Sequence, residues 1–317
     1  KPDWVLIKSR SHSSNPTFFD SSRTPVGTAL FANLTNANTD NTANFTGFIA
    51  GTGSADGGFT VASNGGDTNL SGRTYVAWNW KANGGSTSTI SADSVSSGVP
   101  SVASSVQADT NSGFSIVTFP ANNTNATKVA HGLGAVPKLI IAKETGATSD
   151  WYIYHVALGN NKYARFNNTN TEGEVSSSTV WGNTTPDSNT FTIGNNATGF
   201  AGGGSNDAIA YCFAEIEGYS KFGSYTGNGS TDGPFIYLGF RPRFFIMFLF
   251  SSASLHLWFK YDTKRGEGLQ PINPEVYFSG QSYDQETTFA FADFNANGIK
   301  IRTDNSARNP DGGEFLF

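Results

Sequence analysis

Two short stretches of the sequence place an acid and an arginine where they could form a small charged active-site loop. Residues 18–23 read FFDSSR and residues 260–265 read KYDTKR. In both, the arginine follows the aspartate by three positions, close enough for the two side chains to pair. Because the pattern occurs twice in one chain, internal repetition has to be considered before catalysis.

The segments that position these loops are repeated three times. Pro2, Pro137 and Pro242 each open an apolar run after one intervening residue. Proline at the start of a strand loses no ladder hydrogen bond. In the second and third copies the proline is preceded by Leu-Gly, in LGAVP and LGFRP, and the matching prolines lie 105 residues apart. These features predict three copies of one strand-rich unit.

The repeat decides how the charged loops are interpreted. A second strand ends at FFD, YIYH and FKYD, so Asp20 and Asp262 are matched in the middle copy by His155. Arg23 is matched there by Leu158. A catalytic aspartate would not be exchanged so freely, whereas a residue at a strand end can be. We therefore predict an aspartate that accepts backbone N–H groups in a turn, with its arginine pairing at the surface.

The spacing also sets the expected domain boundaries. We expect a first β-sandwich unit at 1–90, N-terminally incomplete, a Ser-rich connector at 91–112, a second unit at 113–217 and a third at 218–317, C-terminally incomplete. The first copy lacks a counterpart of GFSIVTF, so its sheet is expected to present an unpaired edge near Trp4 to Ile7. Such modules in series predict an elongated part of a longer polypeptide.

The closing strands of the first two copies should show their register by alternation. In the first copy Val76, Trp78 and Trp80 should share one face, as should Ile209, Tyr211 and Phe213 in the second. Tyr75, Ala77 and Asn79 are expected on the opposite face of the first strand.

Composition predicts an all-β fold of tandem antiparallel β-sandwich modules. Of 317 residues, 37% are apolar and 14% aromatic, and Gly, Ser, Thr and Asn dominate the rest, which suits strands and tight turns. A net charge of −5 without a run of Lys or Arg argues against a nucleic-acid partner. No uninterrupted apolar stretch reaches membrane-spanning length, so membrane insertion is not expected.

Several strings together resemble a repeat found in virion structural proteins of marine tailed bacteriophages. They are LGAVPKLIIAK, DWYIYHVALG, GFSIVTFPANNTN, GYSKFGSYTGNGS and RTYVAWNWKA, and the resemblance extends over nearly the whole chain. The resemblance implies concanavalin A-like, jelly-roll sandwiches and a location on the extracellular virus particle. It also implies a homotrimer, the usual arrangement of phage appendages, and it brings no catalytic residues with it.

Other features that could carry chemistry have simpler interpretations. The glycine-rich loops such as GTGSADGG open no helix and lack the Gly-Lys-Ser/Thr ending, so we interpret them as turns. A single cysteine and isolated histidines exclude the usual zinc spacing, and no cofactor is predicted. Calcium stays open as an alternative, because acids in such loops could supply oxygens: Asp56, Asp67, Asp207, Asp232 and Asp311.

The histidines, His12, His131, His155 and His256, are interpreted as strand-end residues, not as catalytic bases. Two carboxylates at glycosidase spacing would arise by chance among 25 acids, so that distance alone would prove nothing. We therefore predict no enzyme.

Trp181, in STVWGNTTPD, is the one candidate binding residue. An exposed tryptophan flanked by polar residues could stack on the CH groups of a sugar. The alternative is a ring folded back over the end of the sandwich.

The sequence thus favours a bacteriophage virion structural protein, a fibre or appendage component that contacts a host-surface glycan. Its expected partners are other virion proteins and further copies of itself, with a trimer favoured. The alternatives are a capsid-decorating or head-fibre protein, and a secreted carbohydrate-binding module or polysaccharide depolymerase.

Overall fold

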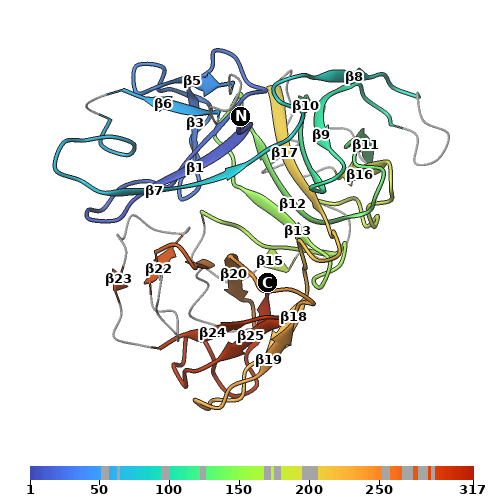
Figure 1. The fold of residues 1–317 in the computed structure, drawn as a ribbon. Coiled ribbons are helices and arrows are strands. Elements are labelled where there is room, and N and C mark those ends of the chain that lie inside the picture. Colours follow the sequence, from blue (N-terminus) through green and yellow to red (C-terminus); the bar gives the residue numbers. More distant parts are fainter. Residues whose placement is uncertain are drawn as a thin grey trace.

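The structure, a computed structural model, describes residues 1–50, 57–62, 65–93, 100–121, 126–167, 173–174, 180–194, 206–251, 258–265, 274–277, 285–286 and 290–317. All regular secondary structure in these ranges is β-strand, and the paired strands run antiparallel (Figure 1). The predicted all-β class of antiparallel sandwiches is confirmed. Across these same ranges, no helix is long and apolar enough to cross a membrane.

The first sandwich pairs a five-stranded sheet with a two-stranded one. The large sheet has the order β4-β3-β2-β1-β7. Its strands are β1 (Trp4–Ser9), β2 (Thr17–Asp20), β3 (Thr28–Phe31), β4 (Thr39–Asp40) and β7 (Tyr75–Trp80). The small sheet is β5 (Phe45–Ile49) with β6 (Gly58–Val61). Between them Phe19 stacks on Phe45, with ring centroids 4.1 Å apart.

The second sandwich has the same plan with extra strands at one edge. Its large sheet has the order β13-β12-β17-β10-β9-β8. These strands are β8 (Ser88–Ile90), β9 (Ser104–Asp109), β10 (Phe114–Ala121), β12 (Pro137–Glu144), β13 (Tyr152–His155) and β17 (Asn206–Ala214). The small sheet pairs β11 (Thr127–Ala130) with β16 (Thr190–Ile193), and a separate short pair joins β14 (Lys162–Tyr163) to β15 (Gly173–Glu174).

The third sandwich, orange to red in Figure 1, has a large sheet of order β18-β26-β20-β21-β22-β23. These strands are β18 (Ser224–Thr226), β20 (Phe244–Leu249), β21 (Trp258–Asp262), β22 (Pro274–Tyr277), β23 (Gln285–Glu286) and β26 (Glu314–Leu316). Its small sheet has the order β19-β25-β24, from β19 (Phe235–Tyr237), β24 (Ala292–Asn295) and β25 (Gly298–Ile301).

Strand register shows that the three sandwiches are copies of one unit. The strand that follows each proline pairs with the next strand through Trp4↔Asp20, Leu139↔His155 and Phe244↔Asp262. Each first-named residue stands two places after its proline, so the pairings are equivalent. The Leu-Gly leads have a backbone reason, since Gly134 and Gly239 have φ of 66° and 83°, which favours glycine.

The closing strands follow the predicted alternation. In β7, Trp78 is buried and Val76 and Trp80 pack with it, whereas Tyr75 and Ala77 pack on the small-sheet side and Asn79 is exposed. In β17, Ile209 and Tyr211 lie in the same cluster as Trp78, with Phe213 packed against it. The register predicted for these strands is confirmed.

The inner faces of the three large sheets share one hydrophobic core. Leu6 from the first sheet, Ile141 from the second and Phe248 from the third belong to a single buried cluster. Aromatic ring pairs cross all three boundaries: Trp4 with Tyr211 at 4.7 Å, Phe166 with Trp258 at 5.0 Å, and Trp80 with Phe244 at 5.8 Å. Each fully buried large aromatic contributes at most about 4 to 6 kcal/mol through apolar area removed from water.

This shared core corrects the expectation of an elongated string of modules. A sheet with apolar residues on both faces has to cover both, and here the small sheet covers one face while the other two large sheets cover the second. The three units therefore close on one another as a ring.

Two further expectations need correction. The Ser-rich segment 91–112 is not only a connector, because β9 lies within it and adds to β10, and β8 adds to β9. The unpaired edge is not at Trp4 to Ile7, because β1 is paired on both sides, with β2 and β7. Among the described strands, β7 is the last strand of the first sheet. In the second sheet the equivalent strand, β17, is paired on that side with β10.

Candidate functional site: the polar junctions between sandwiches

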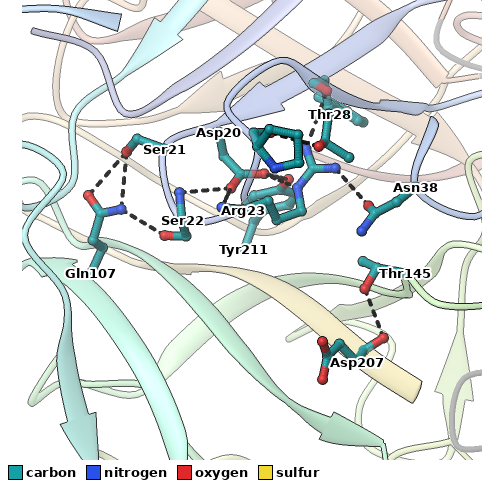
Figure 2. A network of polar contacts seen from close by, with 12 residues as sticks. Asp20, Ser21, Ser22, Arg23, Thr28, Asn38, Gln107, Thr145, Asp207 and Tyr211 are labelled. Carbon is teal, nitrogen blue, oxygen red and sulfur yellow. Dashed lines mark hydrogen bonds and ion pairs between the residues drawn. The ribbon is translucent and has the colours of Figure 1, made fainter. Parts of the chain in front are cut away.

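The FFDSSR loop forms a buried turn at the end of β2. Asp20 Oδ1 accepts the backbone N–H groups of Ser22 and Arg23, both at 3.0 Å, and Oδ2 accepts Arg23 Nε at 2.6 Å (Figure 2). The predicted turn is therefore present. The predicted surface location is wrong, since the arginine and aspartate side chains are only 5% and 0% exposed.

The third sandwich repeats this turn at the end of β21. Asp262 Oδ1 accepts the backbone N–H groups of Lys264 at 3.0 Å and Arg265 at 2.8 Å, and Oδ2 accepts Arg265 Nε at 2.5 Å. This acid and arginine are also buried, with side chains 7% and 3% exposed. The same local sequence thus makes the same turn, because a short carboxylate can reach the amides two and three residues ahead.

In the second sandwich His155 takes the place of the aspartate. The ring atom Nδ1 lies 3.2 Å from the Ala157 backbone N–H and accepts from it, so the proton of the neutral ring is on Nε2. Nε2 then donates to the carbonyl oxygen of Phe317 at 3.0 Å. The imidazole therefore reproduces the aspartate's local hydrogen bond without a charge.

Each of these three strand-end residues also bonds to a neighbouring sandwich. Tyr211 Oη donates to Asp20 Oδ2 at 2.7 Å, which joins the second sandwich to the first. His155 joins the second to the third through Phe317, and Trp78 Nε1 donates to Asp262 Oδ2 at 3.2 Å, which joins the first to the third. The three bonds run in one rotational sense and close the ring; we call them the junction bonds.

A second set of bonds follows the same rotation. Trp151 Nε1 donates to the Phe31 carbonyl at 2.8 Å, and Trp258 Nε1 donates to the Arg165 carbonyl at 2.9 Å. Both tryptophans stand four places before the strand-end residue of their copy. The first copy has Pro16 at that position, which has no donor, so this set is incomplete.

One junction is reinforced by neighbouring polar side chains. Gln107 on β9 donates from Nε2 to Ser21 Oγ at 3.0 Å and to Ser22 Oγ at 2.7 Å, and its Oε1 accepts the Gly85 N–H at 2.9 Å (Figure 2). Arg23 Nη1 donates to Asn38 Oδ1 at 2.9 Å. The buried charge is thus surrounded by partners, as a buried ion pair requires.

Burial fixes the protonation states of the groups that could otherwise react. It lowers the pKa of His155 to about 4, against the opposing effect of the Phe317 carbonyl. It also lowers the pKa of His131 to about 4, with a smaller opposing effect of Asp187. Burial raises the pKa of the Cys212 thiol. Near neutral pH both histidines are therefore uncharged and the cysteine is a thiol, not a thiolate nucleophile.

The structure does not place Trp181 where a sugar could stack. Its ring is 2% exposed and packs edge-on against Tyr154, with centroids 5.8 Å apart, in the core of the second sandwich. Of the two interpretations of Trp181, the structure bears out the ring that is folded back and not the exposed one. After Trp181 the chain turns, with the Thr184 N–H donating to the Trp181 carbonyl at 3.0 Å, and burial of the large apolar ring outweighs the polarity of its neighbours.

The candidate calcium ligands are not brought together. Asp67 accepts the backbone N–H of Asn15 at 2.8 Å, and Asp232 pairs with Lys300 at 2.7 Å. Across the ranges that the structure describes, no group of three or more His, Cys, Asp or Glu side chains could hold a metal ion. Asp56 and His256 lie outside those ranges.

Sequence reasoning missed the partners that complete the junctions. Tyr211 and Trp78 were expected to share a face with apolar neighbours, and both also donate from a polar tip to a strand-end aspartate. Their equivalent positions in the closing strands were the available signal, because a buried Tyr or Trp usually needs a hydrogen-bond partner.

Comparison with known families supplies one result. The model of the family described as a domain of unknown function, DUF7483, matches residues 1–317, which is the whole chain. The chain belongs to the DUF7483 family. No curated protein and no solved structure matches it. The DUF7483 match therefore spans all three sandwiches of this chain.

Proposed function

We propose that this chain is a non-enzymatic structural component of a bacteriophage particle, a fibre or appendage module. The proposal rests on the structural role of the acid, arginine and histidine side chains at the repeated strand ends. There they form buried turns and close the ring between sandwiches. Side chains held in this way provide rigidity, which a particle component exposed to the medium requires.

The resemblance of the repeat strings to virion structural proteins supports the same proposal independently of the fold. The low charge and the abundance of Asn, Thr, Ser and Gly suit a protein that stays soluble while presenting many loops. A secreted depolymerase, the alternative, would need two accessible acids, one with a raised pKa that acts as general acid and one that stays ionised. The strand-end acids do not meet that need, since both side chains are buried and engaged by an arginine.

The proposal is tested on purified particles. Mass spectrometry of density-purified phage, with immunogold labelling against this chain, should find it at stoichiometric levels on an appendage. The isolated chain should release no reducing ends from host polysaccharide. Absence from the particles, together with polysaccharide turnover that disappears on mutation of one exposed acid pair, would support the depolymerase instead.

We further propose that the chain assembles with copies of itself, with a trimer favoured. The edge of β7 supports this, because in the second sandwich the equivalent edge of β17 is covered by β10. In the described part of 91–112, β9 does not supply that cover, since it pairs with β10 and β8. An interface of at least about 1,000 Å² in total is expected for a stable assembly. Light scattering on the chain with its native flanking sequence measures the state, and a monodisperse monomer would contradict the proposal.

A further inference from the structure

The outer face of the small sheet in the third sandwich presents two exposed aromatic rings side by side. On β19, Phe235 is 45% exposed and Tyr237 is 66% exposed, whereas Ile236 between them is only 4% exposed and packs into the core. Alternate residues of a strand point to the same face, about 7 Å apart along the chain. The two rings therefore stand next to each other on the outside of the molecule.

Register places polar side chains on the same face. Phe235 pairs with Lys300, which pairs with Asp293, and Tyr237 pairs with Gly298, which pairs with Asn295. A Cβ atom added to Gly298 would lie 2.9 Å from Cζ of Phe235, so the ring extends over this glycine. The face thus has two aromatic rings on β19 and, beside them, three side chains that can form hydrogen bonds: the ammonium of Lys300, the carboxylate of Asp293 and the amide of Asn295.

The charges on this face cancel in pairs. Lys300 Nζ lies 2.7 Å from Asp232 Oδ1, and Arg302 Nε lies 2.6 Å from Asp293 Oδ2. Two cations and two acids leave no net charge to attract an anionic or cationic ligand. The paired groups nevertheless keep donor and acceptor capacity that hydroxyl groups can use.

We propose that this face binds a neutral saccharide. Sugar CH groups, which carry partial positive charge, would stack on the electron-rich faces of Phe235 and Tyr237. Sugar hydroxyls would exchange hydrogen bonds with Asn295 and with the paired charges of Lys300 and Asp293. The inference adds a ligand to the fibre or appendage module proposed above, and it rests on that proposal only for placing the saccharide on the surface of a host cell.

The third sandwich has these rings and the second does not. Val129 pairs with Phe191 as Ile236 pairs with Ile299, so Lys128 and Ala130 stand where the third sandwich has Phe235 and Tyr237. Ala130 is 1% exposed. Repetition of the fold therefore does not require aromatic residues at these positions. Exposed aromatic side chains without a structural role are a feature of binding surfaces.

The test uses the whole chain and a defined set of probes. Neutral oligosaccharides of glucose, galactose, mannose and N-acetylglucosamine are immobilised beside sialylated and sulfated ones, and the best binder is then titrated by calorimetry. We expect binding to neutral probes. Tyr237→Ser and Phe235→Ser should each weaken it by about tenfold, the effect of one lost stacking contact, whereas Tyr237→Phe should keep it within about threefold.

Tyr219→Ser is the matched control, because Tyr219 is 58% exposed and lies in a turn outside this face. It should leave binding unchanged, and circular dichroism should show all variants folded. The proposal is overturned if no neutral probe binds, if the anionic probes bind better, or if Tyr237→Ser binds like the parent chain. It is also overturned if Tyr237→Ser abolishes self-association while no probe binds, which would assign the face to a protein contact.

Failure of the site and failure of the virion proposal are distinguishable. Particles that contain the chain while the chain binds no saccharide would overturn the site alone. Saccharide binding that depends on Tyr237, by a chain absent from particles, would support the site and overturn the virion role alone.

Discussion

Replacing Tyr211 with phenylalanine removes one junction bond and almost nothing else. The hydroxyl donates to Asp20 Oδ2 at 2.7 Å, and the ring lies in the shared core, 4.7 Å from the ring of Trp4. Phenylalanine keeps the ring, so no cavity of ring size opens. Asp20 keeps Arg23 and two backbone amides, so the carboxylate is not left without partners.

The expected cost follows from the kind of bond removed. A hydrogen bond to a charged acceptor contributes about 1.5 to 3 kcal/mol, more than a bond between neutral groups. We expect Tyr211→Phe to lower the free energy of unfolding by about 2 kcal/mol. The midpoint of urea unfolding should fall with an unchanged slope, because the surface exposed on unfolding stays the same.

Tyr154→Phe is the matched control. Tyr154 is also buried, at 1% exposure, and packs against Trp181, but its hydroxyl makes no hydrogen bond to another described residue. Its removal should cost less than about 0.5 kcal/mol. Equal losses in Tyr211→Phe and Tyr154→Phe would refute the reasoning, because the junction bond would then contribute no more than an ordinary hydroxyl.

Three further predictions concern other residues. Trp78→Phe should cost about 1 to 3 kcal/mol in urea unfolding, because it removes the donor to Asp262 and puts a smaller phenyl ring in place of the indole that lies 4.5 Å from Lys260 Nζ; a loss near zero would remove this junction from the account. His155 has a folded pKa of about 4, below its unfolded value of about 6.5, so stability should be fully present above pH 6.5 and fall towards pH 4, by up to about 3 kcal/mol. In His155→Gln that acid-dependent loss should shrink in a pH series of urea midpoints, and an unchanged series would contradict the burial of the neutral ring. Trp181→Ala should cost about 3 to 5 kcal/mol of stability and leave saccharide binding unchanged, whereas lost binding in a fully stable variant would restore Trp181 as a ligand residue.

The spacing of residues along the sequence was enough to predict the hairpins of the repeat and their turns. The offset of 18 positions from Pro2 to Asp20, and again from Pro137 to His155, sets a hairpin whose register the structure reproduces. The aspartate turn was also predictable, because its partners lie two and three residues ahead in the chain. Patterns of this range depend on backbone geometry that the nearby sequence determines.

Closure of the ring could not be predicted in the same way. Asp20 and Tyr211 are 191 residues apart, and no periodic pattern connects them. Alternation in two closing strands showed which residues share a face but not that the faces of the three large sheets meet, so an elongated string was an equally consistent arrangement. For Trp181 the sequence left two interpretations, because its polar neighbours are compatible with exposure and do not show that the ring is buried on Tyr154.

The central claim is that the three sandwiches form one body, closed by the junction bonds and the shared core. Hydrogen exchange pulses at increasing urea concentration, read by mass spectrometry on β1, β12 and β20, test it most directly, because each strand reports on one sandwich. The account predicts that all three strands lose protection at one common midpoint, and that Tyr211→Phe lowers that midpoint for all three together. Separate midpoints, with the variant affecting only the first and second sandwiches, would contradict it.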